Sequence, residues 1–444
     1  MEKRLVGWRG GAVAPKLFLL FTAYYLLPAG TLVWADDPGL KAEIEVLKER
    51  LAKLEEKLSA GEGDQIVPPT AGEGAAVIQL PSGLQGVQMS GFIDTTFTYN
   101  LNEPETNINT LRVFDTRANS FMLNNAELVI EKPVSSGSPV GFRTDIDWGT
   151  DAEVVGSVTT GLGANAHTHG ETPETAVSDE VELQQAYVEY LAPVGNGLDV
   201  KAGKFVTLHG AEVIESKDNW NISRSYLFGY AIPFSHTGIR TAYPWTERFS
   251  TMVGVSNGWD LVDDTNQGKT IELGFASTPL DGVTLGSTYM VGAEQAGDNS
   301  HQRHLLDIVL GWQPIEPLQL KLNYDYGSED DGASAVVHDN AVWQGLAAYA
   351  RYAVNDRLAL AARGEFFNDA DGVRTAFTSG INGITDDDIK LYEFTLTGEY
   401  KLHEHLIGRL EYRHDTANAR IFRSDDQGQR SYQDTIAMEF IAPF

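Results

Sequence analysis

Polar and apolar residues alternate along most of the chain, from about residue 86 to its end. One face of 391–402 would carry apolar side chains and the other polar ones, and the same alternation recurs in 142–148, 318–326 and 406–413. A period of two is that of a β-strand, whose successive side chains point to opposite faces. The pattern predicts sixteen strands, near 86–100, 120–131, 140–149, 181–191, 197–206, 236–243, 248–257, 268–279, 282–293, 303–313, 317–326, 341–353, 357–368, 388–401, 405–415 and 431–442.

Such strands fit either a soluble sandwich or a membrane barrel. The segments are long enough to cross a bilayer as tilted strands, which needs about 9–11 residues, whereas strands in soluble sheets average about 5–6. Short turns also alternate with long connections, which are 101–119, 150–180, 207–235, 258–267, 294–302, 327–340, 369–387 and 416–430. Short turns at one rim and long loops at the other are typical of outer-membrane barrels. We therefore predict an all-β fold, an antiparallel transmembrane β-barrel of about sixteen strands, with fourteen or eighteen as alternatives.

The first 35 residues have the layout of a secretory signal peptide. A basic start precedes the apolar run 17–27, and small residues, Val33 and Ala35, then offer a cleavage site. Eleven apolar residues are too few for a membrane-spanning helix, which needs about 20. The sequence therefore predicts export of the chain.

A heptad stripe follows at 36–60 and predicts a short coiled coil. Its apolar positions are spaced alternately four and three apart: Leu40, Ile44, Leu47, Leu51, Leu54 and Leu58. A helix this short is marginal alone, so the stripe indicates self-association; an isolated amphipathic helix is the alternative. Residues 61–85 lack periodicity and are rich in Gly, Pro and Ala, which predicts a flexible linker before a barrel domain at 86–444.

Composition narrows the function. The net charge of −29 excludes a general nucleic-acid binder, because phosphate contacts need clustered Lys and Arg. The chain has no cysteine, so disulfides and thiolate chemistry are excluded. Acidic runs such as Asp263-Asp264 offer oxygen ligands that Ca²⁺ or Mg²⁺ prefer, although solvated loop tips are the simpler interpretation. We predict no cofactor and no dedicated metal site.

Enzyme motifs are weak. Residues 254–258 match G-x-S-x-G around Ser256, but that motif requires a strand running into a helix, and a polar loop follows here. His167 and His169 share one side of a loop without an evident third ligand, and His403 and His405 fall on a turn. The sequence therefore predicts that the protein is not an enzyme.

Five blocks resemble the OmpL-like β-barrel porin family: 140–149 (VGFRTDIDWG), 202–210 (AGKFVTLHG), 218–224 (DNWNISR), 233–240 (PFSHTGIR) and 255–260 (VSNGWD). The resemblance covers roughly 88–444 and implies a Gram-negative outer-membrane barrel with channel activity. The last strand, ending in Phe444, also resembles the outer-membrane assembly signal, although Ala442 stands where an aromatic residue is usual. The resemblance implies contact with the barrel-assembly machinery, outer-membrane lipid and lipopolysaccharide. An even number of strands returns both ends of the barrel chain to the periplasmic side, so we expect the coiled coil there.

We therefore predict a passive porin for small hydrophilic solutes or ions, and a trimer by analogy with other sixteen-stranded porins. A barrel that tethers the envelope through its coiled coil, with little conductance, is the alternative. In general porins the third long loop folds into the lumen, so loop 207–235 is the candidate constriction. Opposed acids and bases across the lumen would create a transverse field. The candidate pore residues are Glu212, Glu215, Lys217, Asp218, Arg224, Arg143, Asp145, Asp147, Arg240, Arg409, Glu411 and Arg413.

Overall fold

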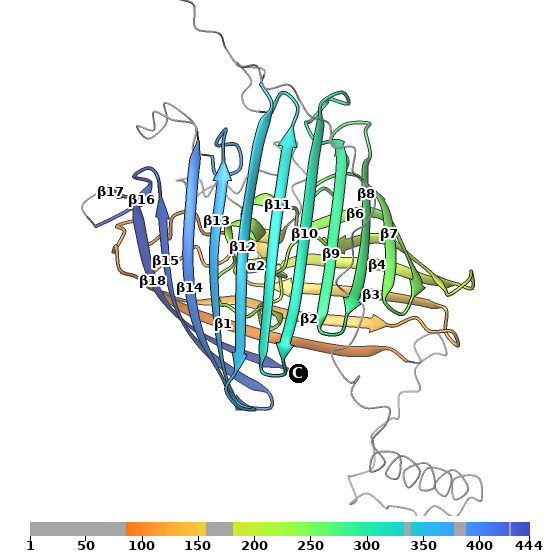
Figure 1. Cartoon of the computed structure of the whole chain (residues 1–444), viewed down its shortest axis with the longest axis horizontal. Coiled ribbons are helices and arrows are strands. Elements are labelled where there is room, and N and C mark those ends of the chain that lie inside the picture. Colours follow the sequence, from red (N-terminus) through yellow and green to blue (C-terminus); the bar gives the residue numbers. More distant parts are fainter. Residues whose placement is uncertain (1–85, 157–180, 333–338, 377–387, 426–427) are drawn as a thin grey trace, which may run out of the picture. The chain divides into compact units, whose positions relative to one another are not determined.

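The structure is a computed structural model that describes residues 86–156, 181–332, 339–376, 388–425 and 428–444. In these residues sixteen long strands close into one antiparallel barrel, as Figure 1 shows. The strands are β1 (Gln88–Asn100), β2 (Ser120–Lys132), β3 (Val140–Trp148), β4 (Val181–Ala192), β5 (Leu198–Val206), β6 (Ser235–Thr246), β7 (Phe249–Ser256), β8 (Thr270–Leu280), β9 (Val283–Ala293), β10 (Gln302–Ile315), β11 (Leu318–Glu329), β12 (Ala341–Ala353), β13 (Leu358–Asp369), β14 (Ile389–His403), β15 (Leu406–Ala417) and β18 (Tyr432–Pro443). The predicted fold is confirmed, and its strand number is sixteen.

Short and long connections alternate around the described barrel as predicted. Pairs such as β8 and β9, or β14 and β15, are joined by tight turns of two residues. On the other rim the connections are long, and the one after β15 contains a small hairpin of β16 (Phe422–Arg423) and β17 (Gln429–Arg430). The predicted signal peptide, coiled coil and linker lie outside the described residues.

The two ends of the barrel chain close the ring. Strand β18 pairs antiparallel with β1, and Phe444 exchanges two backbone hydrogen bonds with Gly91, at 3.0 and 3.1 Å. A side chain at Gly91 would collide with this arrangement, because an added Cβ would lie 2.7 Å from the Phe444 ring. The terminal aromatic residue thus packs at the closing seam.

Exposure of the side chains identifies the solvent on each face of the wall. On β14, Phe394 and Leu396 are 47% and 48% exposed on the outside, whereas Glu393 and Thr395 are 5% and 0% exposed on the inside. A water-soluble sheet would bury the apolar face instead. An apolar exterior around a polar interior is the arrangement of a barrel in lipid.

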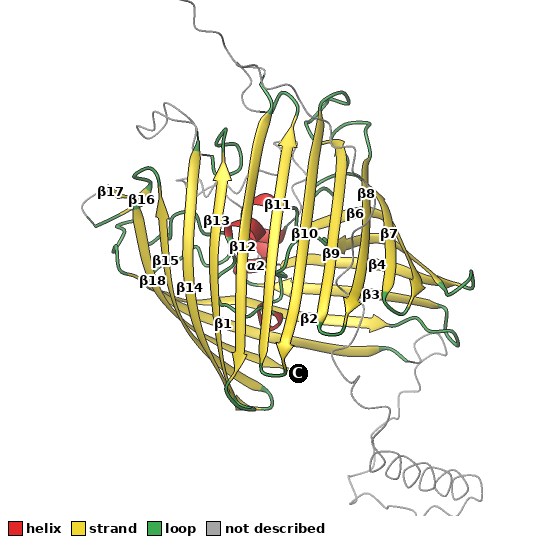
Figure 2. Ribbon diagram, viewed as in Figure 1, coloured by secondary structure: helices red, strands yellow, loops and turns green. Residues whose placement is uncertain are grey.

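The lumen of this barrel contains folded loop segments. Three short helical segments are present among the described residues: α2 (Thr150–Val155), the 3-10 helix η2 (Ser216–Asp218) and the π-helix η3 (Leu227–Ala231). Figure 2 shows these segments in red within the ring of yellow strands. None of the described helices is long and apolar enough to cross a membrane.

Candidate constriction in the barrel lumen

The loop between β5 and β6, residues 207–234, crosses the lumen; we refer to it as the lumen loop. It leaves the wall at β5, and β13 lies halfway around the ring of sixteen strands from there. Arg363 of β13 nevertheless donates hydrogen bonds to Glu212 and to the carbonyl oxygen of Ser223, both at 2.7 Å. Contacts to the opposite wall require that the loop span the interior.

Two carboxylates of the far wall hold backbone amides of the lumen loop. Glu365 of β13 accepts hydrogen bonds from the amides of Tyr226 and Leu227, at 2.7 and 2.6 Å. Glu411 of β15 accepts them from Ile222 and Ser223, at 2.6 and 3.0 Å. These bonds use side chains to satisfy a backbone that belongs to no regular ladder, and bonds to a charged acceptor are the stronger kind.

Two guanidinium groups hold backbone carbonyls of the same loop. Arg409 donates to the carbonyl oxygens of Ser216 and Asn219, at 2.9 and 2.8 Å, and Arg413 donates to that of Arg224 at 2.6 Å. Both arginines also pair with carboxylates of the wall, at 2.8–3.0 Å: Glu399, Glu439 and Asp415. The wall and the loop therefore form one charged network.

Glu212 is the buried acid of the loop in this network. Burial opposes ionisation of its carboxyl, but Arg363 and hydrogen bonds from Ser225 hold the pKa of Glu212 below its ordinary value. The Arg363–Glu212 pair is therefore ionised at neutral pH, with both side chains almost completely inaccessible to solvent.

Apolar packing supplements the charged network. Phe114, from the loop between β1 and β2, lies with its ring centroid 5.8 Å from that of Phe228 and 5.5 Å from that of Phe234. The indole Nε1 of Trp343 on β12 donates to the carbonyl oxygen of Ala231 at 3.0 Å. The lumen of this barrel thus contains an apolar cluster.

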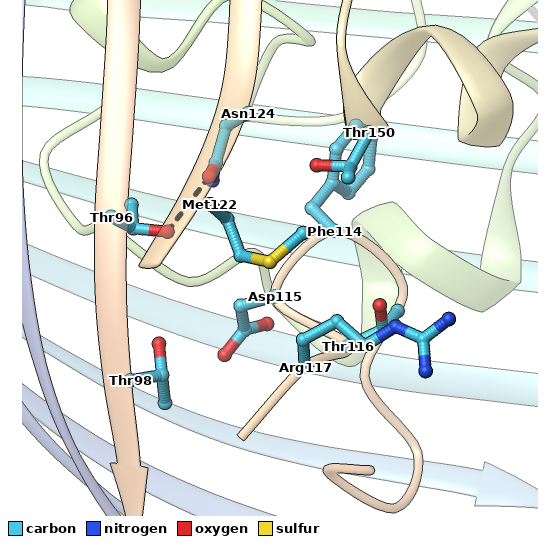
Figure 3. Close-up of a pocket in the computed structure, with 9 residues that line it drawn as sticks. All are labelled: Thr96, Thr98, Phe114, Asp115, Thr116, Arg117, Met122, Asn124 and Thr150. Atoms are coloured by element: carbon cyan, nitrogen blue, oxygen red, sulfur yellow. Dashed lines mark hydrogen bonds between the residues drawn. The ribbon is translucent and has the colours of Figure 1, made fainter. Parts of the chain in front are cut away.

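The loop between β1 and β2 also lies against the inner wall. Figure 3 shows a small cavity at this contact, where Thr96 donates a hydrogen bond to Asn124 at 2.7 Å. Residues of β1, β2, this loop and the start of α2 line the cavity: Thr96, Thr98, Phe114, Asp115, Thr116, Arg117, Met122, Asn124 and Thr150. The loop between β1 and β2 and the start of the connection after β3, which contains α2, therefore occupy the lumen in addition to the lumen loop.

The structure separates the predicted pore residues into distinct environments. Glu212, Arg409, Glu411 and Arg413 belong to the network that holds the lumen loop. Arg224 instead holds the loop to itself, because it donates to the carbonyl oxygens of residues 213, 214 and 222.

The remaining predicted residues lie on the near wall and at the η2 turn. Arg143 pairs with Asp145 on its own strand at 2.9 Å, and Arg240 pairs with Glu272 of β8, two strands away, at 3.0 Å. Four more lie close to Asp145 or at η2: Asp147, Glu215, Lys217 and Asp218, of which the last two form an ion pair.

The expectation of acids and bases facing each other across an open lumen differs from what the structure shows. The partners of the wall arginines lie on the same or nearby strands, or on the lumen loop itself. The physical reason is that a buried charge requires a direct partner, and an open lumen supplies none.

Residues that sequence reasoning missed are concentrated in the loop between β1 and β2. Arg112 is 2% exposed and donates to Asp415 of β15 at 2.7 Å, and it also pairs with Asp115. A signal was present in the sequence, because the apolar residues Leu111, Val113 and Phe114 interrupt an otherwise polar stretch.

The enzyme motifs occupy ordinary positions. Ser256 is the last residue of β7, and a loop without helix follows it, so the strand-to-helix turn of a hydrolase is missing there. His403 and His405 lie on the turn between β14 and β15, and His167 and His169 fall outside the described residues. None of these observations points to catalysis.

The fold and its lumen define a porin-type barrel of the outer membrane. A family model described as "Putative beta-barrel porin-2, OmpL-like" matches residues 86–444, and the chain belongs to this family. The predicted resemblance is thereby confirmed. No curated protein matches the chain.

Solved structures with the same fold are outer-membrane channels and proteins. The chain is similar to the outer-membrane channel DcaP of Acinetobacter baumannii, with 12% identity, a TM-score of 0.53, and coverage of 81% of this chain and 97% of that chain. An anion-selective porin from Comamonas acidovorans gives 11% identity, a TM-score of 0.52, and coverage of 81% and 99%. A loop L8 deletion mutant of OmpT from Vibrio cholerae gives 10% identity, a TM-score of 0.51, and coverage of 81% of this chain and 99% of that chain. At these identities the likeness establishes the fold alone.

Proposed function

We propose that the protein is a passive porin that lets small hydrophilic solutes or ions cross the outer membrane, and that the lumen loop is its constriction. The observation that supports the constriction is the set of hydrogen bonds between strands β13 and β15 and a loop that starts at β5. A loop held at both walls narrows the passage, and the diameter and charge of a passage decide what it conducts. The proposal assigns no catalytic role and no required cofactor.

Single-channel recording tests this function. The purified mature chain should produce discrete conductance steps in a planar bilayer, because a barrel of sixteen strands encloses an aqueous lumen. The folded state is checked by the heat-modifiable shift of its band on a gel. A silent bilayer from folded protein would contradict the proposal.

Ion preference provides a second expected result. The chain carries a net charge of −29, and acidic runs such as Asp263-Asp264 lie in the long loops, so cations should be enriched at the mouth. We expect a weak cation preference, measured as the sign of the reversal potential under a KCl gradient. The double variant Asp263→Asn with Asp264→Asn should move that potential toward zero. A wild-type reversal potential of the opposite sign would refute the expectation.

The second candidate function is a structural role, in which the barrel tethers the cell envelope. The apolar cluster in the lumen favours it, because buried rings such as those of Phe114, Phe228 and Phe234 occupy space that water would need. In this alternative the barrel conducts little, and the stripe at residues 40–58 tethers the envelope. Folded but silent protein in the recording above would support this candidate.

The assembly around the barrel is also proposed. Its apolar exterior contacts outer-membrane lipid, and we place lipopolysaccharide at the long-loop rim and the barrel-assembly machinery as the folding partner. The heptad stripe would lie in the periplasm and associate three chains, which the mass of the detergent-solubilised particle would test.

A further inference from the structure

Four carboxylates gather where the lumen loop passes the near wall. Glu127 of β2, Asp145 of β3 and Glu215 of the loop place one ligand atom each within 4.8 Å of the others. Asp147 lies on the same inner face of β3 as Asp145 and directly opposite Glu127 in the ladder. Like charges in direct cross-strand contact are destabilising unless something compensates them.

The charges around this cluster do not balance. Among the ion pairs of the described residues, only Arg143 reaches one of the four, through Asp145, and it shares its guanidinium with Glu131. Lys217 of the loop also interacts electrostatically with Glu127 and Glu215, but it is shared with Asp218, with which it pairs at 2.5 Å. Elsewhere in the lumen, Glu212 of the lumen loop and Glu365 and Glu411 of the far wall all receive hydrogen bonds. Asp145 also receives them, from Arg143 and Gln185, so the contrast concerns Glu127 and Asp147.

Unsatisfied buried oxygens point to a missing partner. Glu127 is 2% exposed, and its Oε1 has no hydrogen-bond donor among the described residues. Asp147 is 0% exposed, and although the side-chain amide of Asn125 lies near it, neither carboxylate oxygen accepts a hydrogen bond of regular geometry within the described residues. A buried carboxylate oxygen without a hydrogen-bond donor raises the free energy of the folded state, and it is normally satisfied by a proton, a water molecule or a cation.

From this geometry we infer a Ca²⁺ site formed by Glu127, Asp145 and Glu215, with Asp147 as a neighbouring ligand. Ca²⁺ takes carboxylate oxygens at about 2.3–2.6 Å, so two ligands on opposite sides of one ion are about 5 Å apart, in agreement with the grouping. Ca²⁺ also accepts irregular ligand sets, whereas Mg²⁺ demands a near-ideal octahedron and holds its water.

The site would fasten the lumen loop to the wall from which it departs. Glu215 precedes the η2 turn, whereas Glu127 and Asp145 belong to strands, so one ion would bridge a loop and a wall. The inference does not require that the barrel conduct.

Calcium binding by the folded full-length mature chain is the test. Calorimetric titration of chelator-treated protein with CaCl₂ at neutral pH should reveal one saturable site per chain. Glu127→Gln and Glu215→Gln should each weaken it at least about tenfold, because each removes a charged ligand. The matched control is Glu189→Gln, which removes an inner-wall carboxylate that pairs with Lys201 elsewhere on the barrel, and it should bind as the wild type does.

Three results would overturn the inference. The first is the lack of a saturable site, which would mean that protons or water satisfy the cluster. The second is unchanged binding in Glu127→Gln and Glu215→Gln, which would place the ion at the acidic loops. The third is binding of Mg²⁺ but not Ca²⁺. If Glu127→Gln fails to fold, Glu215→Gln decides alone, because that side chain lies on the loop and not in a strand.

Discussion

A barrel in which residues 212–230 are replaced by a short glycine-serine linker should conduct several-fold more current per channel than the wild type. The reason is that these residues carry the contacts to the far wall and also the apolar side chains around η3. Removing them widens the passage, and conductance rises with its cross-section. The measurement is single-channel recording at a fixed KCl concentration.

A deletion in another loop of the same rim is the control for the general effect of shortening a loop. Residues 296–299 lie between β9 and β10, and most of them are exposed. Their removal should leave the conductance unchanged. If the 212–230 variant folds and conducts as the wild type does, the constriction is elsewhere, and the loop between β1 and β2 becomes the next candidate.

Arg363→Met should destabilise the folded protein by about 3–5 kcal/mol, the cost of leaving buried charges without their partner. Arg363 pairs with both Glu212 and Glu393, and its side chain is 0% exposed. Equilibrium unfolding in urea, with the barrel in lipid or detergent, measures the change. Arg248→Met is the control: Arg248 pairs with Asp281 in an exposed turn, where such pairs contribute little.

A triple variant distinguishes the effect of uncompensated charge on stability from the effect of lost side-chain packing. When Glu212→Gln and Glu393→Gln accompany Arg363→Met, the uncompensated charges disappear, and a large part of the stability should return. A loss below about 1 kcal/mol in Arg363→Met alone would show that water solvates the site. The lumen loop would then be held mainly by its apolar contacts.

The strands could be predicted from the sequence because each one meets two different solvents. Lipid on one side and the polar lumen on the other select residues such as Phe394 and Thr395 at alternate positions, so the signal is local. The inward direction of Glu411 and Arg413 followed from the same pattern.

The partners of those inward residues could not be predicted. Glu411 binds amides of residues 222 and 223, nearly two hundred positions earlier, and backbone amides carry no sequence signal. The loop between β1 and β2 was missed for a different reason. Its length and polarity suggested a solvated rim, whereas Leu111 and Phe114 are buried in the lumen.

The route of the lumen loop has a consequence for the order of assembly. The loop is synthesised with the first six strands, but its partners Arg363, Glu365 and Glu411 belong to strands made much later. The ring itself closes only when β18 reaches β1. Contacts this distant in the chain form late, because the entropy of the intervening segments must be overcome first. A half-made barrel therefore has neither the closing pair of strands nor the contacts that hold the lumen loop to the far wall, and both arise only in the last stage of folding.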